Sequence, residues 1–291
     1  MFLPGVREAA KKPAPSPCIN NSRDCGDNLR CLFCFSVAVT LAILSALPEE
    51  QAGIAALLTE PQQQTHAGRQ FTLGHLHGAP VVLALSGVGK VAAASTTTAL
   101  IERLGVRAVV FTGVAGGVGD GVQVGDVVVA SDYVQHDMDA SPIIPRYQVY
   151  GYGNALFACD TALSDALLQA SQRCLQAGAV QWAAELGLPA PRLHRGLIAS
   201  GDRFVSSSAE VQALRSGLQA AGMEPLAVEM EGAAVAQVCT DYQLPFAAMR
   251  SISDRADDSA HLDFPRFVRS IASRYALHTI SSLVQQMARR A

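Results

Sequence analysis

The chain has 291 residues, of which 49% are hydrophobic and 16% are charged, and its formal net charge is −3. This length and composition suffice for a sizeable core, and we expect one large domain. The near-neutral charge, without a basic cluster, argues against nucleic acid and against anionic membranes as partners. The low charged fraction and a mean hydropathy of +0.22 favour apolar surface hidden between subunits, so we expect a homodimer.

Cysteine usage indicates a reducing compartment. Of the seven cysteines, Cys18, Cys25, Cys31 and Cys34 crowd near the N-terminus and the others are scattered. An odd, uneven set is unlike a secreted disulfide framework, and we expect a cytoplasmic protein. The four N-terminal cysteines could ligate zinc, but the spacing of the first pair fits zinc motifs poorly. We therefore expect no zinc site here. An organic cofactor is not expected either.

The first 35 residues are expected to be a disordered extension, because residues 1–30 are polar and lack an apolar period. The uncharged run that follows, 32–47, is too short for a confident transmembrane span. It could be the apolar core of a signal peptide that ends near Ser45 and Ala46. Its second half alternates and is rich in β-branched residues, as a buried strand is. We favour the strand, which gives a folded domain over residues 36–291.

Strands and helices alternate along the rest of the chain. Apolar runs predict strands at 37–44, 69–74, 80–85, 109–111, 127–129, 195–200, 227–230 and 246–252. Helices are predicted at 49–58, 89–104, 161–186, 207–218, 231–242 and 264–288. Segment 132–157 is irregular, and loops of this length are often functional. The alternation predicts a single-domain α/β fold with a mixed, largely parallel central sheet flanked by helices.

A glycine-dense turn joins the apolar runs 109–111 and 127–129. Its glycines are Gly113, Gly116, Gly117, Gly119 and Gly121. Without Cβ atoms, such a backbone can approach a flat ligand closely, although a tight turn between strands has the same composition. The spacing does not match G-x-G-x-x-G. The nearby 87–90 segment lacks the upstream glycine and the Ser or Thr of a P-loop. Both nucleotide fingerprints are therefore excluded here.

Acidic residues follow several predicted strands. In open α/β sheets ligands bind at strand ends, which is where Glu229, Glu231 and Asp254 fall, with Glu50 after the first strand and Phe204 after another. Taken singly, each acid is more often a helix cap or a solvated charge. As a set, they could accept sugar hydroxyls and supply an acid and a base for glycosidic bond cleavage.

Seven ordered motifs carry a resemblance to a known family. They are A-L-P-E-E (46–50), S-G-V-G-K (86–90), T-G-V-A-G-G (112–117), V-G-D (124–126), S-G-D-R-F (200–204), V-E-M-E (228–231) and R-S-I-S-D (250–254). Together they resemble the nucleoside phosphorylase/hydrolase superfamily, above all its 5′-methylthioadenosine/S-adenosylhomocysteine nucleosidases, over about residues 36–288. The resemblance implies a nucleoside phosphorylase-like fold. It also implies hydrolysis of adenine nucleosides that carry a 5′ thio substituent, with release of adenine.

The resemblance also implies roles for single residues. Asp254 would be the general acid at purine N7, Glu50 the general base for the attacking water, and Glu231 the acceptor of the ribose hydroxyls. The other implied roles are Gly116 and the Val205 backbone at the base, Phe204 stacked on it, Met230 under the ribose and purine, Arg250 in support of the water site, and Leu47, Val88 and Phe264 around the 5′ substituent. Cleavage near Ala46 would remove the first strand, so the signal-peptide alternative fails.

Some positions depart from the nucleosidase pattern. Val114 stands where a serine is usual, Pro48 replaces an acid, and segment 140–152 matches weakly, so the 5′ substituent stays open. One alternative is a phosphorylase of the same fold, with Lys90 as its candidate phosphate-binding cation. The other is a non-catalytic purine-binding protein, which would not need Glu50. His136 and His261 are expected to be structural.

Overall fold

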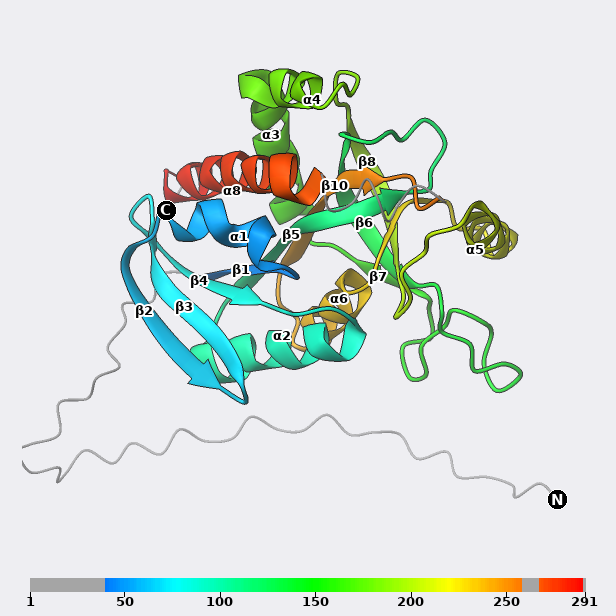
Figure 1. Cartoon of the computed structure of the whole chain (residues 1–291). Coiled ribbons are helices and arrows are strands. Elements are labelled where there is room, and N and C mark those ends of the chain that lie inside the picture. The colour runs from blue at the N-terminus through cyan, green and yellow to red at the C-terminus, as the bar shows by residue number, and fades with distance from the viewer. Residues whose placement is uncertain (1–39, 258–266, 290–291) are drawn as a thin grey trace, which may run out of the picture. The chain divides into compact units, whose positions relative to one another are not determined.

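The computed structural model describes residues 40–257 and 267–289 (Figure 1). Its centre is a ten-stranded mixed sheet. The strands are β1 (Leu41–Ser45), β2 (Thr59–His66), β3 (Arg69–Leu76), β4 (Ala79–Leu85), β5 (Ala108–Gly117), β6 (Val127–Gln135), β7 (Leu156–Ala158), β8 (Leu193–Ser200), β9 (Pro225–Glu229) and β10 (Phe246–Asp254). Strands β4, β1, β5 and β10 lie side by side and run parallel.

One half of the sheet closes on itself. Strand β10 pairs with β5 on one side and with β6 on the other. Strand β6 continues to β8, β8 to β9, and β9 returns to the end of β5 at Gly116 and Gly117. From β5 the other half extends through β1, β4 and β3 to β2 at the edge. The carboxyl ends of β1, β5 and β10 and the end of β9 therefore meet at one place.

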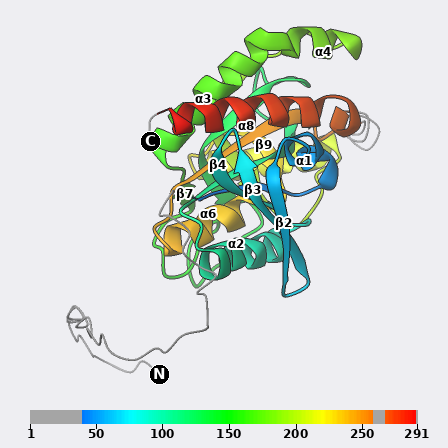
Figure 2. The ribbon, with the colours of Figure 1, turned by 90° about the vertical axis from the view of Figure 1, so that its left-hand side faces the viewer.

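Helices cover both faces of the sheet (Figures 1 and 2). They are α1 (Pro48–Ala55), α2 (Lys90–Leu104), α3 (Thr161–Cys174), η1 (Leu175–Ala179), α4 (Val180–Glu185), α5 (Ser208–Ala220), α6 (Gly232–Asp241), η2 (Val268–Ala272) and α8 (Ser273–Ala288). One core lies between the sheet and α1, α3 and α8, and a second lies between the sheet and α2 and α6. Alternate residues of β1 serve the two cores, which explains its uninterrupted apolar sequence.

The α/β fold expected from the sequence is confirmed. Strand β2 was not expected, because its sequence, TEPQQQTH, is polar and almost entirely exposed. The single helix expected over 161–186 is interrupted by η1, where Gly178 has non-helical dihedrals, and it continues as α4. The N-terminal extension and its cysteines, together with His261 and Phe264, lie outside the described residues. No helix in the described ranges is long and apolar enough to span a bilayer.

Candidate active site

A cavity of about 500 Å³ opens where the ends of β1, β5, β9 and β10 meet. Nine of the residues predicted from the sequence line it: Leu47, Glu50, Val88, Gly116, Phe204, Val205, Met230, Glu231 and Asp254. They come from segments that lie as far apart in the chain as Leu47 and Asp254, and the sheet brings them together. Val114, Glu229 and Ser253 also contribute to the wall.

Glu50 is held by three backbone amides. It lies in the first turn of α1, directly after β1, and is 2% exposed. Its Oε2 accepts hydrogen bonds from the amides of Ala46 and Leu47, both at 2.9 Å, and Oε1 accepts one from Val114 at 3.0 Å. Burial raises the pKa of the Glu50 carboxyl above its ordinary value, while these amides and Arg250 act in the opposite direction. The geometry fixes one carboxylate at the cavity wall and makes it a better proton acceptor.

Asp254 closes β10 and is 2% exposed. The Ser253 hydroxyl donates to its Oδ2 at 2.7 Å, and the Ala256 amide donates to Oδ1 at 2.8 Å. Gly116 is the register partner of Asp254 on β5. A Cβ at Gly116 would come within 3.0 Å of Asp254 Oδ1 and 2.8 Å of the Ala256 Cβ. Glycine is therefore needed at this position for the carboxyl group to keep its place.

Glu231 begins α6 as its N-cap residue, next to Met230. Its Oε1 accepts a hydrogen bond from the Gly89 amide at 2.8 Å, which ties α6 to the start of α2. Burial, followed by the charge of Glu229, raises the pKa of Glu231 to about 8. A carboxyl group of this kind exchanges its proton near neutral pH, and it faces the same cavity as Glu50 and Asp254.

Glu229 and Arg250 form a buried ion pair behind this turn. Arg250 Nη2 lies 2.7 Å from Glu229 Oε2, and the guanidinium stacks on the Phe111 ring at 3.9 Å from its centroid. Glu229 also accepts hydrogen bonds from the Gly232 amide at 2.9 Å and from the Ser200 hydroxyl. Glu229 was expected at a strand end, but its sequence position alone did not indicate a role. Arg250, expected to support the water site, does not itself line the cavity.

The rim of the cavity is partly open. Val88 is 56% exposed and Phe204 is 43% exposed. Lys90, the candidate phosphate-binding cation, donates from Nζ to Asp137 at 2.6 Å and to Gln135 at 3.0 Å.

Burial lowers the pKa of His136, one of the two histidines that were expected to be structural. Within the described part of the chain, no three His, Cys, Asp or Glu side chains are grouped as ligands of a metal ion would be.

Comparison with known proteins shows which family the chain belongs to. The model of the phosphorylase superfamily matches residues 40–285. A curated 5′-methylthioadenosine/S-adenosylhomocysteine nucleosidase from Chromohalobacter salexigens is 36% identical over 250 residues, which are 86% of this chain and 97% of that protein. The chain belongs to the nucleosidase family of the phosphorylase superfamily. The resemblance read from the seven sequence motifs is thereby confirmed.

Solved structures of the nucleosidase family share the fold. The enzyme from Neisseria meningitidis, in complex with methylthio-immucillin-A, has a TM-score of 0.74 and 33% identity, and the match covers 85% of this chain and 99% of that one. A futalosine hydrolase from Helicobacter pylori has a TM-score of 0.72 and 32% identity, with 86% and 98% covered. Proteins at this level of similarity thus carry names with different substrates.

Proposed function

We propose that the chain hydrolyses the N-glycosidic bond of adenine nucleosides with a 5′ thio substituent, 5′-methylthioadenosine and S-adenosylhomocysteine, and releases adenine. The placement of Glu50 supports this proposal most. Its carboxylate is fixed by three amides in a cavity that also holds Glu231 and Asp254. Hydrolysis requires an acid at the leaving group and a base for water, and these side chains supply both.

In the proposed mechanism, Asp254 protonates purine N7 as the bond to the sugar breaks. Glu50 orients a water molecule and removes its proton during attack at the anomeric carbon. Glu231 accepts the ribose hydroxyls, and in its ionised form its charge stabilises the oxocarbenium-like transition state. For the remaining contacts we propose Gly116, Val205 and Phe204 at the base, Met230 at the ribose, Arg250 behind the water, and Leu47, Val88 and Phe264 at the 5′ substituent.

The same geometry disfavours phosphate as the nucleophile. At about 4 Å and an effective dielectric near 20, two like charges repel by about 4 kcal/mol, so ionised Glu50 would oppose a phosphate dianion. Lys90 is already paired with Asp137. The amides of Gly89 and Lys90 at the start of α2, where an anion would otherwise bind, donate to Glu231 and Asp202.

Product analysis tests the proposal directly. The protein is incubated with 5′-methylthioadenosine, S-adenosylhomocysteine and futalosine, each with and without phosphate. We expect adenine and a free thioribose product from the first two, at a rate indifferent to phosphate. A sugar 1-phosphate that forms only when phosphate is added would overturn the hydrolase assignment. Turnover of futalosine but of neither thio nucleoside would overturn the substrate assignment.

Variants identify the groups responsible. Glu50→Gln and Asp254→Asn should each lower kcat by about 10²–10⁴-fold, the usual contribution of a positioned base or acid. Glu49→Gln is the matched control, because Glu49 is the exposed neighbour of Glu50 on the same helix. Near-normal kcat in Glu50→Gln would remove Glu50 as the general base. Adenine binding without turnover in the wild-type protein would instead favour the purine-binding alternative.

We also propose a homodimer in the cytoplasm. Ile143 and Tyr150, in the segment between β6 and β7, are 81% and 80% exposed, and an apolar subunit contact would cover them. Cys159, Cys174 and Cys239 are buried free thiols, in keeping with a reducing compartment. Residues 1–35 are proposed to be an extension outside the catalytic domain, supported by a family match that starts at residue 40.

A further inference from the structure

Helix α2 cannot cap its own N-terminus. Its N-cap residue is Gly89, which has no side chain to accept a hydrogen bond. The first amides of a helix need partners and carry partial positive charge. Two carboxylates from distant segments supply those partners: Glu231 accepts from the Gly89 amide at 2.8 Å, and Asp202 accepts from the Lys90 amide at 2.7 Å.

Asp202 also takes part in a closed ring of contacts with Lys90 and Asp137. The Asp202 amide donates to Asp137 Oδ2 at 2.9 Å, and Asp137 Oδ1 lies 2.6 Å from Lys90 Nζ. The three residues come from the start of α2, from the loop after β6 and from the loop after β8. The ring therefore joins three loops at the rim of the cavity.

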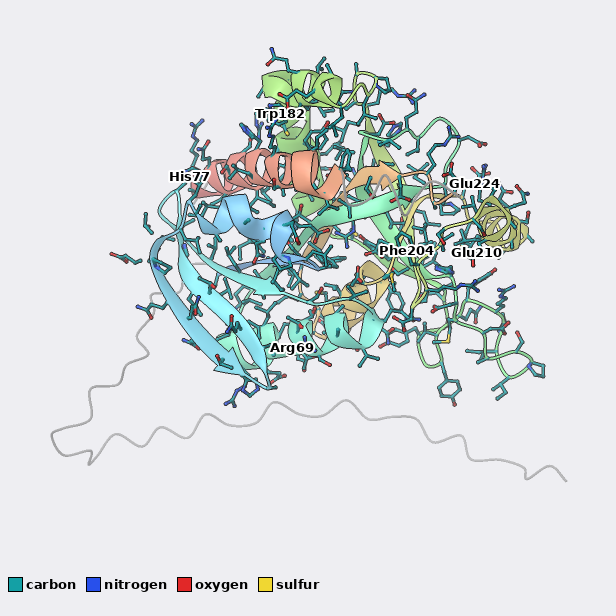
Figure 3. All side chains as sticks on the ribbon, viewed as in Figure 1. Arg69, His77, Trp182, Phe204, Glu210 and Glu224 are labelled. Carbon is teal, nitrogen blue, oxygen red and sulfur yellow. The ribbon has the colours of Figure 1, made fainter. Side chains whose placement is uncertain are left out.

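The loop that Asp202 holds carries part of the cavity wall. Arg203, Phe204 and Val205 follow Asp202 directly, and all three line the cavity. Figure 3 shows Phe204 on the side of the molecule that carries α5. On the other side of the ring, Val88 lies two residues before Lys90 and also lines the cavity. Phe204 is 43% exposed, and its ring is carried by this loop.

The strength of this fastening lies in its backbone bonds. An exposed ion pair contributes little by itself, and the Asp137 carboxylate is one third exposed. The bond from the Lys90 amide to Asp202 is also exposed, but it places a charged acceptor at the positive end of a helix. A Cβ at Gly89 would lie 3.2 Å from Asp202 Oδ1, and φ of Gly89 is +96°, so this close approach depends on glycine.

We propose that Asp202 is a positioning residue for the base subsite: it fastens the loop that carries Phe204 and Val205 to the start of α2, with Lys90 and Asp137 completing the ring. The inference rests on the proposed function for the identity of the base, adenine. It assigns a role to Asp202 and Lys90 that acts on base binding and not on the attack of water.

Two substitutions at residue 202 separate this role from general stability. Asp202→Asn keeps an oxygen acceptor for the Lys90 amide, whereas Asp202→Ala removes it. We expect Asp202→Ala to raise the Kd for adenine, measured by calorimetry, and the KM for 5′-methylthioadenosine by about 10-fold, the scale of a lost base–aromatic stack. Its kcat should change less, and Asp202→Asn, which keeps the oxygen acceptor but loses the charge, should raise the Kd by a smaller factor than Asp202→Ala. Asp139→Ala is the control, because Asp139 is an exposed acid of the same loop as Asp137.

A double-mutant cycle with Phe204→Ala decides whether Asp202 acts through the loop. If it does, Phe204→Ala should weaken adenine binding strongly in the wild type and only slightly in Asp202→Ala. Independent, additive effects would overturn the inference, as would an unchanged Kd in folded Asp202→Ala. Because adenine binding is measured, the result does not depend on hydrolysis. Failure of the wild-type protein to bind adenine would instead count against the proposed function.

Discussion

At the scale of single residues, the absence of side chains decides where the acids stand. Gly113 lies on β5 opposite Glu50, and a Cβ there would come within 2.8 Å of Glu50 Oε1. That is closer than real contacts allow. The carboxylate cannot retreat without losing its bonds to the amides of Ala46, Leu47 and Val114. The position of the proposed base therefore depends on the absence of a side chain at Gly113.

Gly113→Ala should accordingly reduce kcat while the protein still folds. A misplacement of about 1 Å in a reacting group costs about 10²-fold in rate, and we expect a loss of that order in steady-state assays. Gly53→Ala is a suitable control, since its Cβ would meet only the Leu277 side chain, at 3.3 Å. Wild-type kcat in Gly113→Ala would contradict the tight seat described for Glu50.

The raised pKa of Glu231 predicts a pH dependence of stability. The folded protein holds this proton more tightly than the unfolded chain, because the pKa rises from 4.5 to about 8 on folding. The stabilisation is fully present below pH 4.5 and is lost as the pH rises to about 8. Urea denaturation at several pH values should show this decline, and Glu231→Gln should flatten it. An equal slope in both proteins would rule out Glu231 as its origin.

At the scale of helices and strands, much of the architecture could be predicted. Strands β5 and β10 are buried on both faces, so each begins with an apolar run that is easily recognised. Strand β2 pairs only with β3 at the edge of the sheet. Its sequence is polar, so it lacks the apolar alternation that predicts a strand. The strand-end acids could be predicted as well, because they directly follow apolar runs that are recognisable as strands.

Contacts between elements could not be predicted in this way. The ion pair of Glu229 with Arg250, and the bond of Asp202 to the start of α2, join residues 21 and 112 positions apart. Nothing in the local sequence specifies such partners, because strand order determines them. Arg250 was expected to support the water site, but its contacts with Glu229 and with the Phe111 ring could not be predicted, for this reason.

At the scale of the whole molecule, the segment between β6 and β7 should contact a second subunit. Ile143→Asp would place a charge in that contact, and we expect it to shift the protein from dimer toward monomer in light scattering, with a higher KM if the segment reaches the partner's cavity. Val180→Asp is the matched control, because Val180 is an exposed valine of α4. A wild-type protein that is an active monomer at assay concentrations would contradict the homodimer.

The place of β10 has a consequence for synthesis on the ribosome. This strand, which carries Asp254, is inserted between β5 and β6, yet it is made more than a hundred residues after them. A nascent chain that has reached residue 245 already contains Glu50 and Glu231, but its sheet still lacks a central strand and its site lacks an acid. Pairing over such sequence distances forms late and slowly. Incomplete chains therefore emerge inactive, and the capacity to cleave nucleosides arises only when the last strand enters the sheet.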